Sequence, residues 1–156
     1  MLRLSLIILA CFFASILAFH DVKFRNCKSL FTVHSLEVSG AQLVEDNGHH
    51  ITVLKKGTHP KIRIKFTPDV ALDSFTTTVN AKIDGALLKW SMPEPNACKF
   101  MDCPVAADTQ NVYEQAIHIK NEYPTDKTVQ INWVIDGDRE DIHHDVCVIF
   151  LARIEK

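Results

Sequence analysis

The sequence has no excess of charge of either sign. Its 17 lysines and arginines nearly balance its 19 aspartates and glutamates, so the formal net charge is −2 at pH 7. A protein that binds nucleic acid usually carries a dense basic surface, because it must neutralise phosphate groups. The composition therefore argues against a nucleic-acid partner.

The sequence also lacks the short motifs that mark common catalytic sites. It has no Gly-x-Ser-x-Gly nucleophile elbow, no His-Glu-x-x-His zinc motif and no glycine-rich phosphate loop, and only five of its 156 residues are glycine. We therefore expect no enzymatic activity, no catalytic residues and no cofactor.

No segment after the N-terminal apolar run has a convincing helical stripe, whereas alternation of apolar and polar residues is widespread. From Lys61 to Phe66 the apolar residues share one face and the basic residues share the other, which is typical of a half-buried antiparallel strand. Phe75 to Ile83 repeats the pattern, and Asp84-Gly85 predicts a hairpin turn into Ala86 to Trp90. The other expected strands are Val22 to Cys27, Val33 to Val38, Ile51 to Leu54, Val112 to Lys120, Thr128 to Asp136 and Val146 to Ala152.

These segments predict about eight short strands at the spacing of a β-sandwich. Val146 to Ala152 is apolar on both faces, which indicates a strand in the middle of a sheet. No repeat, linker or low-complexity segment divides the chain after its N-terminal run. The expected fold is all-β, a single antiparallel β-sandwich whose two sheets pack their apolar faces about 10 Å apart.

The long apolar run is confined to the N-terminus. Arg3 precedes the apolar residues from Leu4 to Leu17, and Ala18 suits a signal-peptidase site. The run is shorter than the roughly 20 residues that a membrane span needs. We predict a secretory signal at residues 1–18, one domain at residues 19–156 and an extracellular location.

Five cysteines become four when Cys11 leaves with the signal, and an even number in a secreted chain indicates a disulfide framework. Three pairings are formally open. A bridge between Cys98 and Cys103 leaves Cys27 to pair with Cys147, which ties the first strand after the signal to the last.

The segment from Trp90 to Val105 contains three prolines. Proline removes backbone donors and fixes φ, so no central strand or helix continues through this segment. If Cys98 and Cys103 are bridged, the small ring stiffens the loop and leaves Trp90 and Met92 upstream of it. We expect this loop to form the rim of a pocket.

Several short motifs occur in an order that resembles one family. They are Asp-Val-Lys-Phe-Arg-Asn-Cys ending at Cys27, Lys55-Lys56-Gly57, Pro93-Glu94-Pro95-Asn96-Ala97-Cys98, Cys103-Pro104-Val105, Glu122-Tyr123-Pro124, Ile131-Asn132-Trp133 and Cys147. No single motif is specific, but their joint order and spacing resemble the ML lipid-recognition family, which includes the Niemann-Pick type C soluble sterol-transfer proteins and the group-two mite allergens. The resemblance implies an immunoglobulin-like β-sandwich whose sheets splay apart to admit a lipid, with no catalytic step.

The resemblance also implies which side chains contact the ligand, because Trp90, Ile119 and Tyr123 match pocket positions of the sterol carriers. A place at the pocket mouth suits Tyr123, since a buried hydroxyl needs a polar partner. Alternatively, Trp90 and Tyr123 are core aromatics or a surface pair. The other expected pocket residues come from the apolar rows and the loop: Ile64, Phe66, Val79, Met92, Ile131 and Ile149.

Without a cavity, the same apolar rows would interdigitate as a dry core. The protein would then be an immunoglobulin-like secreted recognition module with a filled core that binds a protein partner. An immunoglobulin domain pins its sheets with cysteines far closer in sequence than Cys27 and Cys147, which argues against this alternative.

The expected partner is a sterol, a fatty acid or another lipid, carried by a monomer that makes a transient membrane or receptor contact for delivery. The basic row of Lys61, Arg63 and Lys65 is either a solvated face or a docking surface for anionic head groups. Residues 19–156 contain no Asn-x-Ser/Thr sequon, so delivery to the lysosomal lumen through a glycan tag is not supported.

Two further features bear on the site. The family's usual third disulfide would fall near Ala41 and Thr52, and neither is cysteine, so the hairpin between them is expected to be unpinned. The histidine pairs His49-His50 and His143-His144 have no metal-ligand spacing around them, so we expect turn residues and no metal. A further hypothesis is that the second pair, which lies among acidic residues, couples acidity to ligand release.

Overall fold

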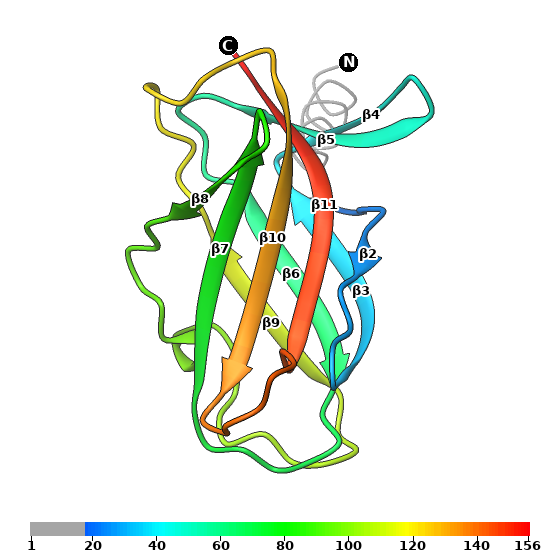
Figure 1. Cartoon of the computed structure of the whole chain (residues 1–156), viewed down its shortest axis with the longest axis vertical. Helices are drawn as coiled ribbons and strands as arrows, with labels where there is room; N and C mark the ends of the chain where they lie inside the picture. Colours follow the sequence, from blue (N-terminus) through cyan, green and yellow to red (C-terminus); the bar gives the residue numbers. More distant parts are fainter. Residues whose placement is uncertain (1–17) are drawn as a thin grey trace, which may run out of the picture.

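The structure is a computed structural model that describes residues 18–156. These residues form two β-sheets that lie face to face (Figure 1). The predicted secretory signal lies, apart from Ala18, outside the described residues. No helix within residues 18–156 is both long and apolar enough to cross a membrane. The elements are β1 (Phe19–Asp21), β2 (Arg25–Asn26), β3 (Thr32–Ser39), β4 (Gln42–Asp46), β5 (His49–Lys55), β6 (Lys61–Thr67), β7 (Phe75–Ile83), β8 (Ala86–Trp90), the 3₁₀ helix η1 (Ala97–Lys99), β9 (Asn111–Ala116), β10 (Thr128–Gly137) and β11 (Val146–Glu155).

The two sheets differ in size. The smaller sheet has the strand order β1-β3-β6-β9, and the larger has the order β4-β5-β11-β10-β7-β8, with β2 pairing with β11 outside this path. β11 lies between β10 and β5, in the middle of the larger sheet. The predicted two-sheet, all-β fold is confirmed, and so is the central place of the strand that is apolar on both faces.

Alternation with a period of two accounts for much of the inner surface. In β6, Ile62, Ile64 and Phe66 are buried, whereas the basic residues between them are more exposed. β7 and β8 form the predicted hairpin, in which Asp84 and Gly85 have φ values of +49° and +85°. Two consecutive positive φ values characterise the type I′ turn, whose twist matches that of the flanking strands.

Several features differ from the expected strands. β1 was not predicted, and only Arg25–Asn26 of the expected strand from Val22 to Cys27 forms a strand. β4 has weak alternation and was not predicted; it forms a hairpin with β5. β5 in turn runs parallel to β11, and this pairing holds the hairpin that lacks the family's third disulfide. β9 ends at Ala116 rather than Lys120, because its partner β6 begins at Lys61. Beyond that point the N–H of Ile117 donates to the carbonyl of Pro60 at 2.9 Å.

One side of the sandwich is tied by the disulfide between Cys27 and Cys147, which joins the residue after β2 to β11. Nearby, the N–H groups of Leu30 and Phe31 donate to the carbonyls of residues 144 and 145 at 2.9 Å each. This segment leads directly into β3 of the smaller sheet, so the tie connects the two sheets.

The other side is closed by the loop of residues 91–105, which contains the disulfide between Cys98 and Cys103. The N–H of Thr77, on β7 of the larger sheet, donates to the carbonyl of Pro95 at 2.7 Å. The N–H of Glu114, on β9 of the smaller sheet, donates to the carbonyl of Phe100 at 2.9 Å. The loop is therefore bonded to both sheets.

The two disulfides enclose very different lengths of chain, with sequence separations of 120 and 5 residues. In the chain-entropy model, closing such loops contributes about 5 and about 2 kcal/mol to the free energy of unfolding. We expect the double variant Cys27→Ser/Cys147→Ser to lose more stability in urea unfolding than Cys98→Ser/Cys103→Ser. Equal losses would show that local native contacts, and not loop length, decide the effect.

Candidate functional site

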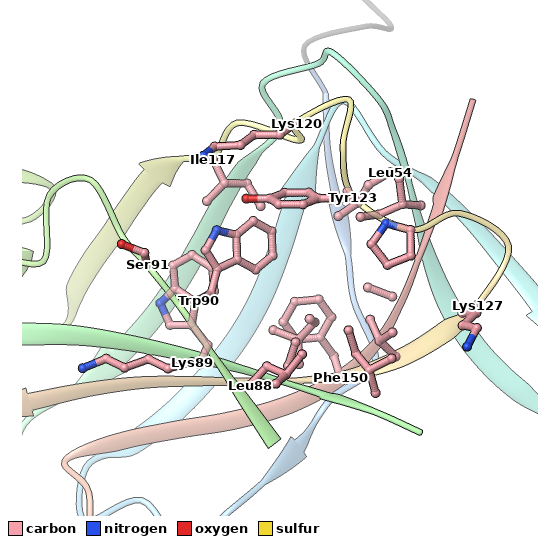
Figure 2. A pocket seen from close by; sticks show the side chains of 18 residues that line it. Leu54, Leu88, Lys89, Trp90, Ser91, Ile117, Lys120, Tyr123, Lys127 and Phe150 are labelled. Carbon is pink, nitrogen blue, oxygen red and sulfur yellow. The ribbon is translucent and has the colours of Figure 1, made fainter. Parts of the chain in front are cut away.

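A cavity of about 390 Å³ lies at one end of the sandwich, between the larger sheet and the segment 117–127 (Figure 2). It is bounded by the final residues of β5 and β11, the first half of β10, the β7–β8 hairpin and the segment 117–127. Its volume is within the range of small-molecule sites. The lining residues are Leu54, Ala81, Ile83, Leu88, Lys89, Trp90, Ser91, Ile117, Lys120, Tyr123, Pro124, Lys127, Val129, Ile131, Trp133, Phe150, Ala152 and Ile154.

The strands of the larger sheet give the cavity an apolar wall. Val129, Ile131 and Trp133 of β10 line it, and so do Phe150 and Ala152 of β11. Within each strand these residues are two positions apart, as side chains on one face of a sheet must be. A wall of this kind offers water few hydrogen bonds, so it suits an apolar ligand.

Two aromatic side chains meet at the mouth of the cavity. The rings of Trp90, at the end of β8, and Tyr123 form a T-shaped contact, with 5.2 Å between centroids and 80° between planes. Burial raises the pKa of the Tyr123 phenol, and the carboxylate of Glu122 raises it further. The hydroxyl is therefore neutral at pH 7 and keeps a proton to donate.

Backbone hydrogen bonds hold the segment that carries Tyr123. The N–H of Ile119 donates to the carbonyl of Thr58 at 3.0 Å, and the N–H of Gly57 donates to the carbonyl of Ile119 at 2.7 Å. Gly57 has a φ of +73°, a conformation that glycine adopts without steric cost. At the other end of the segment, the N–H of Asp126 donates to the carbonyl of Ile154 at 3.0 Å. Tyr123 is thus placed on a loop that is anchored at both ends.

Three of the expected ligand residues, Trp90, Tyr123 and Ile131, line the cavity. Ile119 does not line it, although its side chain is completely buried in the core. Ile117, on the same face of the chain two residues earlier, lines it instead. The structure therefore brings the aromatic pair and β10 together, with Ile119 as part of the supporting core.

Four other expected residues lie in the packed part of the sandwich. Ile64, Phe66 and Val79 are completely buried, and Met92 packs against the core from the loop. None of the four lines the cavity. The reason is that the sheets pack closely there, so their side chains meet one another and leave no space for a ligand.

Ile149 is placed on the opposite face of its strand from the cavity. Its neighbours Val148 and Phe150 are buried in the core, and Phe150 lines the cavity. Because successive residues of a strand point to opposite faces, Ile149 points outward. β11 is apolar on both faces, so its alternation does not reveal which face is inside.

The disulfide loop does not form the rim, which corrects the expected role of the segment from Trp90 to Val105. Within this segment only Trp90 and Ser91 line the cavity. Asn96 instead pairs with Thr76 near the start of β7, whereas the cavity lies at the end of β7. The prolines indicate a stiff loop correctly, but the loop runs along the side of the sandwich.

The remaining lining residues were not predicted. Ala81 and Ile83 share the face of Val79, so their strand pattern contains a signal that the cavity extends to the hairpin. No comparable signal identifies the polar lining residues, because exposed lysines and serines occur in any turn. The lining residues that were missed are Leu54, Ala81, Ile83, Leu88, Lys89, Ser91, Ile117, Lys120, Pro124, Lys127, Val129, Trp133, Phe150, Ala152 and Ile154.

The basic row on the smaller sheet is paired with carboxylates. Lys61, Arg63 and Lys65 form ion pairs with Glu37 and Glu114 at distances between 2.6 and 3.3 Å. Burial acts to raise the pKa of both carboxyl groups, but the hydrogen bonds and positive charges of the row outweigh it, so both pKa values lie below the ordinary value. This row is therefore a neutralised face and not a free cationic surface.

A second hollow of about 750 Å³ lies where the smaller sheet meets the β4–β5 hairpin. Its lining includes the charged side chains of Lys55, Lys61, Arg63 and Glu114. Such a wall suits water better than an apolar ligand. The smaller, apolar cavity is the candidate site.

The two histidine pairs differ in their place in the fold. His49 and His50 are exposed residues at the start of β5, and so are strand residues and not the expected turn residues. His143 and His144 are exposed in the connection between β10 and β11, at the opposite end of these strands from the cavity. His144 Nδ1 lies 2.9 Å from a carboxylate oxygen of Asp136. Within the described part of the chain, no group of three or more His, Cys, Asp or Glu side chains is placed to hold a metal ion.

The described residues thus form an all-β sandwich with an apolar cavity at one end. A sequence model of the ML domain matches residues 21–154. The chain therefore belongs to the ML family, a lipid-binding family without a catalytic function.

Individual relatives agree with this assignment. The heh-1 protein of Caenorhabditis elegans is 34% identical over 140 residues, which cover 88% of this chain and 90% of the relative. NPC intracellular cholesterol transporter 2 of Mus musculus is 31% identical over 88 residues, covering 56% of this chain and 58% of the relative. The crystal structure of a Niemann-Pick type C2 protein from the Japanese carpenter ant superposes with a TM-score of 0.73 at 18% identity, covering 85% of this chain and 99% of that structure. This superposition confirms the fold.

Enlarging a small lining residue tests whether the cavity is a site. We expect Ala152→Leu to weaken binding of a fluorescent sterol or fatty acid by about tenfold or more, because the added side chain occupies ligand space. The melting temperature is expected to stay the same or rise, since the new side chain fills an existing cavity. Ala116→Leu, on the exposed face of β9, is the matched control. Unchanged probe affinity in Ala152→Leu would show that the probe binds elsewhere.

Proposed function

We propose that this protein is a secreted, non-enzymatic carrier that holds one sterol, fatty acid or other hydrophobic ligand in the cavity at the end of its sandwich. It acts as a monomer and exchanges the ligand by equilibrium capture and release. The observation that carries the proposal is the apolar cavity at the end of the sandwich, with Trp90 and Tyr123 at its mouth. Membership of the ML family supports it, as does the mouse relative, whose name describes a cholesterol transporter.

The free energy of such binding comes mainly from the apolar surface of the ligand. A sterol-sized ligand that buries about 500 Å² of apolar surface gains on the order of 12 kcal/mol. The loss of translational and rotational freedom, and the ordering of side chains, offset much of this gain. The remainder suits a carrier, which has to release its ligand as well as capture it.

Secretion is proposed from the N-terminal sequence and the cysteines. Removal of residues 1–18 leaves the domain of residues 19–156, and β1 begins at Phe19, so this cleavage keeps all of the described strands. The guanidinium carbon of Arg63 lies over the ring of Phe19, 3.4 Å from the ring centroid. Two disulfides suit an oxidising compartment. N-terminal sequencing of the secreted protein tests the site, and a first residue other than Phe19 would contradict it.

Extraction of the native protein is the most direct test of the carrier function. The protein is purified from a eukaryotic secretion host without detergent, and its bound lipids are identified by mass spectrometry. A single hydrophobic ligand at close to one equivalent supports the proposal. Recovery of no lipid, together with no binding of fluorescent sterol or fatty acid, would reject it.

Truncation of the tryptophan at the mouth separates a binding role from a structural one. We expect Trp90→Ala to weaken probe binding by about tenfold while the melting temperature falls by only a few degrees, because Trp90 is only half-buried and its ring contacts Tyr123 at the mouth. Trp90→Phe, which keeps an aromatic ring, should restore most of the affinity. A large loss of stability without a change in affinity would assign Trp90 to the fold.

We propose that delivery uses the β7–β8 hairpin beside the mouth. Leu87 and Leu88 of the edge strand β8 are 59% and 52% exposed, and Leu88 also lines the cavity. Exposed apolar side chains next to a ligand exit favour brief contact with a bilayer. The basic row of the smaller sheet is less suited to this contact, because Glu37 and Glu114 neutralise it.

The delivery surface is tested by the rate of transfer. We expect Leu87→Ser to slow transfer of a fluorescent ligand to lipid vesicles severalfold without changing its equilibrium affinity, since Leu87 does not line the cavity. Leu43→Ser, at an exposed leucine of β4, serves as the control. Equal transfer rates for both variants and the unaltered protein would exclude Leu87 from the contact.

A further inference from the structure

The polar side chains that line the cavity share one property. Each carries a hydrogen-bond donor, and no Asp, Glu, Asn or Gln side chain lines the cavity. The ionisable lining residues other than Tyr123 are all lysines. A ligand whose polar group only accepts hydrogen bonds and carries negative charge therefore matches this lining better than a neutral one. The residues concerned are Lys89, Ser91, Lys120, Tyr123 and Lys127.

The three lysines are not equivalent. Lys127 is paired with Asp84, with 2.5 Å between its amine and the carboxylate. Lys89 alternates with Leu88 and Trp90 along β8, which directs its side chain to the outer face of the strand. Figure 2 shows its amine extending away from the cavity.

Lys120 has the most available amine at the mouth. Its partner carboxylate, on Glu122, is 3.9 Å away, and the two side chains are 52% and 70% exposed. An exposed pair at this distance contributes little, so a ligand can displace it. The lysine itself is held by its backbone, because the carbonyl of Lys120 accepts a hydrogen bond from the N–H of Tyr123 at 3.3 Å.

The donors gather on one side of the cavity. Figure 2 shows the amine of Lys120 reaching past Ile117, on the same side as the hydroxyl groups of Tyr123 and Ser91, with Lys127 on the opposite side. A head group at this position would meet the positive charge of Lys120 and the hydroxyl donor of Tyr123, while its tail extended along the apolar wall of β10 and β11.

We propose that the mouth is a head-group site for anionic amphiphiles, in which Lys120, assisted by Tyr123, binds a carboxylate, sulfate or phosphate group. This inference rests on the proposed carrier function and specifies the class of its ligand. The tail supplies most of the affinity, and Lys120 supplies the preference for a negative head group.

Two matched ligand pairs test the preference, oleic acid against oleyl alcohol and cholesteryl sulfate against cholesterol. Each is titrated against the full protein by displacement of a neutral fluorescent probe at pH 7.5 and low salt. We expect the anionic member of at least one pair to bind about fivefold more tightly than its neutral counterpart, as a half-exposed ion pair would give. Preference in the first pair alone indicates a carboxylate on a flexible chain, and preference in the second alone indicates a sulfated sterol.

Charge variants assign the preference to a residue. Lys120→Gln, which keeps most of the side-chain length, should lower the affinity for the anionic member more than that for the neutral member, and so remove the difference between the members of the preferred pair. Lys82→Gln is the matched control, since Lys82 is an exposed lysine of β7 that does not line the cavity. The melting temperature of each variant verifies that the fold is intact.

The outcomes distinguish this inference from the function on which it rests. Equal binding of the acidic and neutral members in both pairs would overturn the head-group site while leaving the carrier function in place. An equal loss of preference in Lys82→Gln and Lys120→Gln would show that general surface charge, and not Lys120, is responsible, and would also overturn it. Failure of all four ligands to bind would reject the carrier function itself.

Discussion

The distance between the two sheets is set along their sides, and the cavity depends on this constraint. On one side the disulfide of Cys27 connects β11 to the segment that enters β3, and on the other the loop of residues 91–105 is hydrogen-bonded to both β7 and β9. Where the sheets fully overlap, large side chains fill the space, as in the stacked rings of Phe31 and Phe66 with 5.8 Å between centroids. At the other end the smaller sheet stops at Ser39, Lys61 and Ala116, while β10 and β11 of the larger sheet are covered there by the segment 117–127. A cavity results because a loop replaces a strand as the opposing wall.

Much of this architecture could be predicted from alternation alone, where one face of a strand is polar. β6 and β7 have such a face, so Ile64 and Val79 could be assigned to the interior, and Asp84-Gly85 fixed the hairpin. β11 has no polar face, so alternation does not distinguish its inner residues from its outer ones. Ile149 was therefore expected to face the interior, whereas the structure places Phe150 there. Most residues that were assigned to the interior do lie in the core. Alternation does not show, however, where along a strand the opposing sheet ends. That is why Ile64 and Phe66 belong to the packed core and not to the cavity.

The mouth could be predicted only in part, because it is assembled from the ends of elements that are far apart in the sequence. Trp90 and Tyr123 could be named through the family resemblance, and their rings do meet. The expected rim at Cys98 and Cys103 was wrong, because the loop bonds to the side of the sandwich through Thr77 and Glu114, and only a folded chain reveals those partners. Lys120 has no distinctive local pattern, and its importance follows from the side chains gathered around it in space.

The distribution of charge suggests whether the protein or its bound ligand would respond to a fall in pH. Glu37 and Glu114 have pKa values below the ordinary range, because the basic row outweighs the effect of burial. Their contribution to stability is therefore complete above about pH 4.3 and is lost only as the pH falls through the lower folded-state values, so the smaller sheet keeps its charge in mild acid. At the mouth, the raised pKa of the Tyr123 phenol keeps it neutral from acidic to neutral pH. If the head group is a carboxylate, its own protonation would weaken its interaction with the mouth, so the chemistry of the ligand would contribute to the pH of release.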